Sequence, residues 1–261
     1  SKYEGKNYTY MSGTSMATPH VAGGILAVNA MLEAHPEIKF TKAEKSALIK
    51  AILMNTATLI EVPGADGKLF SVRLQGSGLM DLDRATNPNV VTVVDAKSDS
   101  SSFNEPKVEL KQIKETKLPI NLNLKNYTGS DVSYDVTYVV QTDLLKEDGT
   151  LSQDTKTYKP HEIAKGSLDS VTVFANRTVN FAKTIDFSNG DLPTNFPKGY
   201  FVDAFVIFTP KNGDYTVLSV PVLAFKGNWE EDVAIFEDYI DTFKLDEKRP
   251  FWVEQEFTKL D

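Results

Sequence analysis

The sequence has no cysteine, which excludes disulfides and thiolate metal sites. It also has no apolar run of about 20 residues, so we expect no transmembrane helix in this chain. Basic side chains are in the minority, with 28 Lys and Arg against 36 Asp and Glu, and the formal net charge is −8. Without a basic face to neutralise phosphates, the composition argues against nucleic acid as a partner.

The remaining composition is that of an ordinary folded protein. Its 261 residues suffice for one to three domains, and the chain is 41% hydrophobic and 25% charged. Residues 230–261 carry eleven acidic and four basic side chains, so most of the negative charge lies at the C-terminal end. We expect residues 229–261 to be an acidic linker or the start of a further domain.

The N-terminal part of the chain, residues 1–95, is predicted to be mainly helical. From Ser15 to about Ala34 nearly every position is apolar or small, which is typical of a helix buried all round by closely packed backbone. A second helix is predicted from Thr41, with Glu44 as its capping-box partner, to about Ala57. The region also contains a turn at 76–78, Asp81 and Asp83 as helix-start residues, and a strand at 90–94. Because almost no strand is predicted to cover the first helix, we expect a sheet upstream.

Beyond a serine-rich boundary at residues 95–103, the apolar period changes from 3.6 to 2. Turn-forming sequences, such as those at 147–149, 189–190 and 211–214, separate the apolar runs. About seven short strands with little helix predict an antiparallel β-sandwich over residues 104–228. Strands are expected at 118–124, 132–140, 171–174, 179–185, 201–208 and 217–225.

The sequence Gly13-Thr14-Ser15-Met16-Ala17-Thr18-Pro19-His20-Val21-Ala22-Gly23-Gly24 places a serine where a helix is predicted to begin. It resembles the nucleophile segment of the subtilisin-like serine proteases at nearly every position. The resemblance implies that Ser15 attacks the scissile carbonyl, that its backbone N–H forms half of the oxyanion hole, and that Gly13 and Thr14 bind substrate. The other half of the oxyanion hole would be an upstream asparagine side chain. In this family the catalytic Asp and His precede the serine, so we expect this chain to be the back part of a larger protease.

The chemistry of a serine nucleophile supports this interpretation. A serine hydroxyl needs a base to take its proton, and unpaired N–H groups at a helix N-terminus favour an oxyanion nearby. None of the three histidines is placed to act as that base: His20 lies about 140° round the helix from Ser15, His35 lies about 30 Å along it, and His161 belongs to the β region. The resemblance implies that His20 is a packing histidine, and we predict that this chain alone is inactive.

The resemblance extends beyond the serine, at residues 51–57, 75–81, 199–208 and 218–229. These segments are similar to the cell-envelope proteinases of Gram-positive bacteria, the lactocepins and the complement-cleaving streptococcal surface peptidases. The resemblance implies the C-terminal helical portion of an α/β subtilisin-like domain at 1–95, followed by a fibronectin type III-like sandwich that braces it. It also implies an extracellular, wall-associated enzyme that cleaves proteins or peptides, with the upstream part of the same protease as a partner. We expect no metal and no cofactor in this chain.

Two other interpretations remain open. A protease scaffold that has lost its upstream Asp or His could serve as a surface binding or adhesion module. A purely structural spacer would leave the serine motif unexplained. Within the β region, the segment at 143–170, with Tyr158 and His161, is a candidate for contact with substrate, although an ordinary surface loop is the simpler interpretation.

Overall fold

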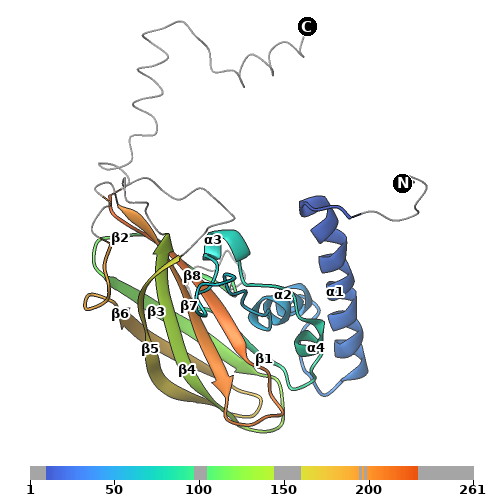
Figure 1. Ribbon diagram of the computed structural model, residues 1–261. Coiled ribbons are helices and arrows are strands. Elements are labelled where there is room, and N and C mark those ends of the chain that lie inside the picture. The colour runs from blue at the N-terminus through green and yellow to red at the C-terminus, as the bar shows by residue number, and fades with distance from the viewer. Residues whose placement is uncertain (1–9, 97–104, 144–159, 194–195, 197–198, 229–261) are drawn as a thin grey trace, which may run out of the picture.

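The computed structural model describes residues 10–96, 105–143, 160–193, 196 and 199–228. In these residues a group of helices precedes a group of strands, and Figure 1 shows the helices on one side of the sheets. The helices are α1 (Thr14–Ala34), α2 (Lys45–Asn55), α3 (Val72–Gln75) and α4 (Leu82–Ala85). The strands are β1 (Val91–Asp95), β2 (Val108–Ile113), β3 (Lys117–Asn126), β4 (Val132–Asp143), β5 (Pro160–Val173), β6 (Thr178–Asp186), β7 (Tyr200–Pro210) and β8 (Leu218–Lys226). The acidic segment 229–261, the boundary residues 97–103 and Tyr158 lie outside the described residues.

The first helix forms where it was predicted, but this chain does not bury it all round. Its buried residues are Gly24, Val28, Met31 and Leu32, which pack toward α2 and α4. On the rest of its surface Leu26 is 69% exposed. In this chain α2 and α4 cover one face of α1 and leave the other open to solvent, so burial of the helix all round, by the sheet expected upstream, stays a prediction.

The predicted capping box at the start of the second helix is present. The backbone N–H of Thr41 donates to Oε2 of Glu44 at 2.8 Å, and the N–H of Glu44 donates to Oγ1 of Thr41 at 3.2 Å. The regular helix begins slightly later than predicted, at Lys45, because the capping residues form a turn. Asp81 is also a helix-start residue, as predicted, since its side chain accepts the N–H of Arg84 at 3.1 Å.

Two sheets make up the β region. One is three-stranded in the order β1-β3-β6, and the other is five-stranded in the order β2-β8-β7-β4-β5. Every neighbouring pair is antiparallel except β2 and β8, which are parallel, so the prediction of a purely antiparallel arrangement is wrong at this edge. The strand predicted at 90–94 exists as β1 and pairs with β3, within the sheet of the second region.

The period-2 alternation explains how the two sheets share one core. Alternate residues of β3 and of β7 are buried in the same hydrophobic cluster: Leu118, Ile120, Leu122 and Leu124, with Val202, Ala204, Val206 and Phe208. The described part of the segment that was expected to be a loop, residues 160–170, belongs instead to β5, which pairs with β4 over its whole length.

The helices cover the second face of the five-stranded sheet. Asp203 and Phe205 alternate with the core residues of β7 and so point away from the shared core, yet both are 0% exposed. They are buried because α2 and α3 pack on β7 and β8. The helices therefore lie on one side of the paired sheets, where α2 also contacts β1 of the three-stranded sheet, and α1 is the outermost element (Figure 1).

Candidate functional site

Ser15 lies in the first turn of α1 and is exposed to solvent. The carbonyl oxygen of Gly13 accepts the N–H groups of Met16 at 3.0 Å and Ala17 at 3.1 Å. The N–H groups of Thr14 and Ser15 precede these and have no acceptor within the helix. The hydroxyl of Ser15 is thus accompanied by two unpaired donors at the positive end of a 21-residue helix, an arrangement that suits a developing negative charge.

Gly13 caps this helix in a conformation that requires glycine. Its backbone has φ 141° and ψ 165°, a region that residues with a Cβ rarely adopt. The space around it is open, since the nearest atom to an added Cβ would be Sδ of Met16 at 3.9 Å. Glycine is therefore needed first for the backbone turn into α1.

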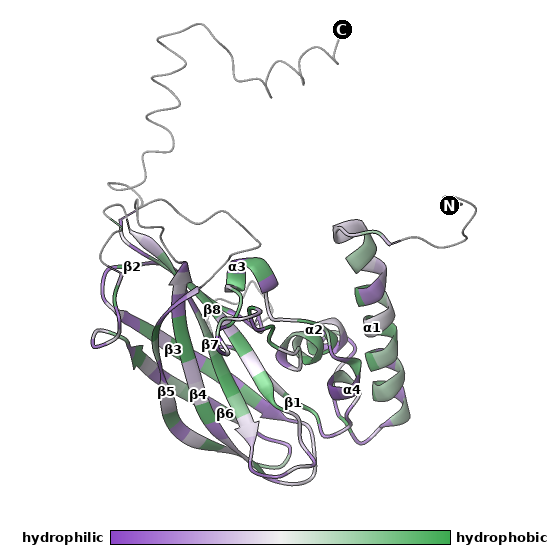
Figure 2. Ribbon diagram, viewed as in Figure 1, coloured by the Kyte–Doolittle hydropathy of each residue, from purple (hydrophilic) through white to green (hydrophobic). Residues whose placement is uncertain are grey.

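Ser15 shares its side of α1 with exposed apolar surface. Ala22 and Leu26 lie seven and eleven residues after Ser15, which places all three within about 20° of one direction round the helix. Ala22 is exposed, and Leu26 is 69% exposed. A Cβ on Gly23 would meet nothing within 4 Å, whereas one on Gly24 would lie 2.4 Å from Sδ of Met80. Figure 2 shows hydrophobic residues along much of α1, so Ser15 stands at one end of an uncovered apolar face.

The structure gives each histidine a hydrogen-bond partner other than Ser15. Nδ1–H of His20 donates to the carbonyl of Met16, one turn earlier, at 2.7 Å. His35 pairs with the carboxylate of Glu37 at 2.8 Å, and His161 donates to the carbonyl of Asp191 at 2.6 Å. The described residues therefore bring no base to the serine hydroxyl.

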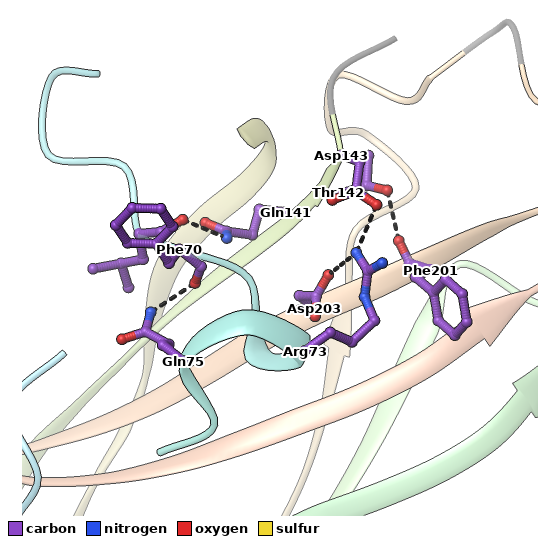
Figure 3. Close-up of polar contacts among 9 residues, drawn as sticks. Phe70, Arg73, Gln75, Gln141, Thr142, Asp143, Phe201 and Asp203 are labelled. Carbon is purple, nitrogen blue, oxygen red and sulfur yellow. Dashed lines mark hydrogen bonds and ion pairs between the residues drawn. The ribbon is translucent and has the colours of Figure 1, made fainter. Parts of the chain in front are cut away.

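A polar cluster that the sequence did not reveal joins α3 to the five-stranded sheet. Nη2 of Arg73 donates to Oδ2 of Asp143 at 2.7 Å and to Oδ2 of Asp203 at 2.9 Å (Figure 3). Its guanidinium lies over the ring of Phe201, 4.5 Å from the centroid. Burial raises the pKa of Asp203, and Arg73 offsets part of that rise. The cluster thus fixes α3 on β4 and β7.

Asn55 at the end of α2 makes a second polar connection and is 0% exposed. Its Oδ1 accepts the N–H of Val93 in β1 at 2.8 Å, and its Nδ2 donates to the carbonyl of Ser219 in β8 at 3.2 Å. One side chain therefore ties α2 to both sheets.

One signal in the sequence could have pointed to the Arg73 cluster. Asp203 is the lone charge within an otherwise apolar strand, and a buried carboxylate requires a partner. The identity of that partner is not readable, because Arg73 lies 130 residues earlier in the chain. No helix in the described residues has the length and hydropathy to span a membrane.

In this chain a serine at the start of a helix precedes a two-sheet β region, the order expected from the resemblance to a subtilisin-like segment followed by a β domain. Comparison with known families agrees. Residues 1–105 match the family model described as the subtilase family, and residues 108–223 match the Fn3-like domain. Residues 1–105 are thus similar to the subtilase family, and residues 108–223 are similar to the Fn3-like domain.

Bacterial proteinases are similar to this chain over most of its length. The chain is 28% identical over 242 residues to the PII-type proteinase of Lactococcus lactis subsp. cremoris, covering 88% of this chain and 12% of the relative. It is 28% identical over 235 residues to a C5a peptidase of Streptococcus pyogenes serotype M18, covering 88% of this chain and 19% of that protein. A further C5a peptidase of Streptococcus pyogenes is 27% identical over 248 residues, covering 93% and 20%. The chain thus spans a fifth or less of the length of these relatives.

Proposed function

We propose that this chain is the nucleophile-bearing part of a cell-surface serine endopeptidase that cleaves extracellular proteins or peptides. Ser15 attacks the scissile carbonyl to form an acyl-enzyme, and its backbone N–H stabilises the oxyanion. Gly13 and Thr14 border the bound substrate. The names of the relatives, a proteinase and C5a peptidases, support a protein or peptide substrate.

The observation that carries this proposal is the position of Ser15 in the first turn of α1, with the N–H groups of Thr14 and Ser15 free of intrahelical bonds. A serine is a weak nucleophile, and this placement supplies the stabilisation of developing charge that it needs. It does not supply a base. The proposal therefore assigns the general base and its orienting carboxylate to a preceding part of the same protease.

The uncovered side of α1 supports that assignment. Ser15, Ala22 and Leu26 face the same way, and beside this face a Cβ added to Gly23 would meet nothing within 4 Å. We propose that the segment holding the Asp and His packs on this face, which would bury the apolar residues and place the histidine beside Ser15. Covering the face and completing the catalytic site would then be one event.

The β region has a supporting role in this proposal. Residues 1–95 belong to the catalytic domain, residues 104–228 form a fibronectin type III-like sandwich that braces it, and residues 229–261 are an acidic linker or the start of a further domain. The relatives come from Gram-positive bacteria, and we place the enzyme outside the cell at the cell wall.

The test is covalent labelling of Ser15 by a fluorophosphonate probe, with this chain compared with the full-length protein that contains it. We expect labelling of the full-length protein and none of this chain, because the base is missing here. Ser15→Ala should abolish the labelling, while Ser12→Ala, which removes an exposed serine three residues earlier, should leave it unchanged.

Absence of labelling in a folded full-length protein would contradict the proposal. The interpretation as a catalytically dead scaffold that binds a ligand or surface would then be favoured. Labelling of this chain alone at the rate of the full-length protein would contradict the need for an added base.

A further inference from the structure

The short helix α3 is attached to the five-stranded sheet through one side chain. Arg73 contacts two neighbouring strands at once, Asp143 in β4 and Asp203 in β7, and its guanidinium also covers the ring of Phe201. The Asp203 side chain is 0% exposed and that of Asp143 is 19% exposed. A guanidinium held at several points has little freedom to shift, so this contact determines how α3 sits on the sheet.

The next link runs from α3 to the loops beside it. Oε1 of Gln75 accepts the N–H of Ile60 at 2.8 Å. Nε2 of Gln75 donates to the carbonyl of Phe70 at 2.6 Å (Figure 3). Movement of α3 relative to the sheet would therefore move the backbone around Ile60.

That backbone continues into a short bridge with the segment after α3. Thr58 and Leu79 exchange both backbone hydrogen bonds, each at 2.8 Å. The contact is close, since a Cβ added to Gly78 would lie 2.4 Å from the carbonyl oxygen of Thr58. The hydroxyl of Thr58 also donates to Oδ2 of Asp81 at 2.9 Å, which fixes the start of α4.

The last link reaches the helix that carries Ser15. Met80, between Leu79 and Asp81, packs against α1 at Gly24, where an added Cβ would lie 2.4 Å from its Sδ. A Cβ added to Gly24 would also lie 3.3 Å from Cδ2 of Leu82 in α4. A continuous series of contacts thus joins the five-stranded sheet to α1.

We propose that Arg73 is a positioning residue that transmits the placement of the five-stranded sheet, through α3 and the Thr58–Leu79 bridge, to α1. A buried ion pair contributes only modestly to stability. It favours one position of α3 on the sheet over others, because in any other position Asp203 loses its counter-charge. The consequence for Ser15 rests on the proposed function. The coupling between Arg73 and α1 does not rest on the proposed function, because it involves only contacts among residues of this chain.

The test is hydrogen exchange of backbone amides in this chain. Arg73→Met/Asp203→Asn removes the contact without leaving a charged Asp203 buried and unpaired. We expect exchange at 58–62, 79–81 and 24–34 to become at least tenfold faster, with the core amides of β3 and β7 unchanged within twofold. Arg73→Lys, which keeps a cation, should restore part of the protection.

Lys211→Met is the control, since it removes the cation of an exposed ion pair with Asp135 of β4, on the same sheet but outside the series of contacts. It should leave exchange at 58–62 unchanged. Equal acceleration in helices and sheets would overturn the proposal, because it would indicate a global loss of stability. Wild-type exchange in the double variant would overturn it as well. Failure of Ser15 to react in the full-length protein would instead contradict the proposed function and leave the exchange result intact.

Discussion

Replacement of Asn55 by alanine should destabilise this protein through loss of two specific hydrogen bonds. The side chain is 0% exposed, accepts the N–H of Val93 at 2.8 Å and donates to the carbonyl of Ser219 at 3.2 Å. Val93 lies in β1, an edge strand of its sheet, so its outward N–H depends on this amide. Alanine cannot replace either bond, and water would have to enter a buried interface to do so.

The magnitude follows from the two backbone groups left behind. A buried donor or acceptor without a partner costs about 1–3 kcal/mol. The bond to Ser219 is long, so we assign it the lower end of that range and the bond to Val93 the upper end. The expected loss for Asn55→Ala is therefore about 2–4 kcal/mol, equivalent to a fall in Tm of roughly 4–16 °C for a chain of this size.

Urea unfolding followed by circular dichroism measures this loss, and exchange of the Val93 amide tests its cause. Asn29→Ala is the control, because Nδ2 of Asn29 bonds the exposed Glu33 within α1 and its removal should cost at most about 0.5 kcal/mol. A loss below about 1 kcal/mol for Asn55→Ala, or continued slow exchange at Val93, would refute the reasoning.

Three further predictions concern the same framework. Gly78→Ala should cost about 3 kcal/mol or more, because Gly78 has φ 119° and an added Cβ would clash with the Thr58 carbonyl. Gly76→Ala, at φ 60° and ψ −123° in open space, should cost less, about 1–3 kcal/mol from backbone strain alone. Thermal unfolding of the two variants compares them. Glu44→Ala should destabilise α2 at neutral pH, and its difference from wild type should shrink below about pH 4.5, because the bonds from Thr41 lower the pKa of Glu44 and their contribution is lost as pH falls through that lowered pKa. Asp203→Asn should show the opposite pH dependence of stability, because burial raises the pKa of Asp203. As pH falls toward 3.8, the folded wild type binds a proton before the unfolded chain does, so the wild type gains stability relative to the variant. Urea midpoints measured between pH 3.5 and pH 8 test both signs, and a pH-independent difference in either case would contradict the assigned cause.

Much of the local structure could be predicted from the sequence because it depends on near neighbours. The capping box between Thr41 and Glu44 spans three residues and forms as expected. The apolar run after Gly13 predicts α1 nearly to the residue, since helical hydrogen bonds link positions four apart. Alternation at 118–124 predicts which side of β3 enters the core. The serine motif likewise gives the position of Ser15 at the start of a helix, while its role as a nucleophile remains a prediction.

Contacts between segments far apart in the sequence were decided by the tertiary structure. Arg73 meets Asp203 across 130 residues, and Asn55 meets Ser219 across 164, so no period or motif connects them. The parallel pairing of β2 with β8 departs from the antiparallel expectation for the same reason, because alternation reports which side of a strand is buried and not which strand lies beside it. Burial of α1 could not be judged from its composition either, since an apolar helix is covered only where another element packs on it. The sequence alone therefore determined the local elements and the serine motif, whereas the connection between the helix of Ser15 and the sheets depends on long-range contacts that exist only in the folded chain.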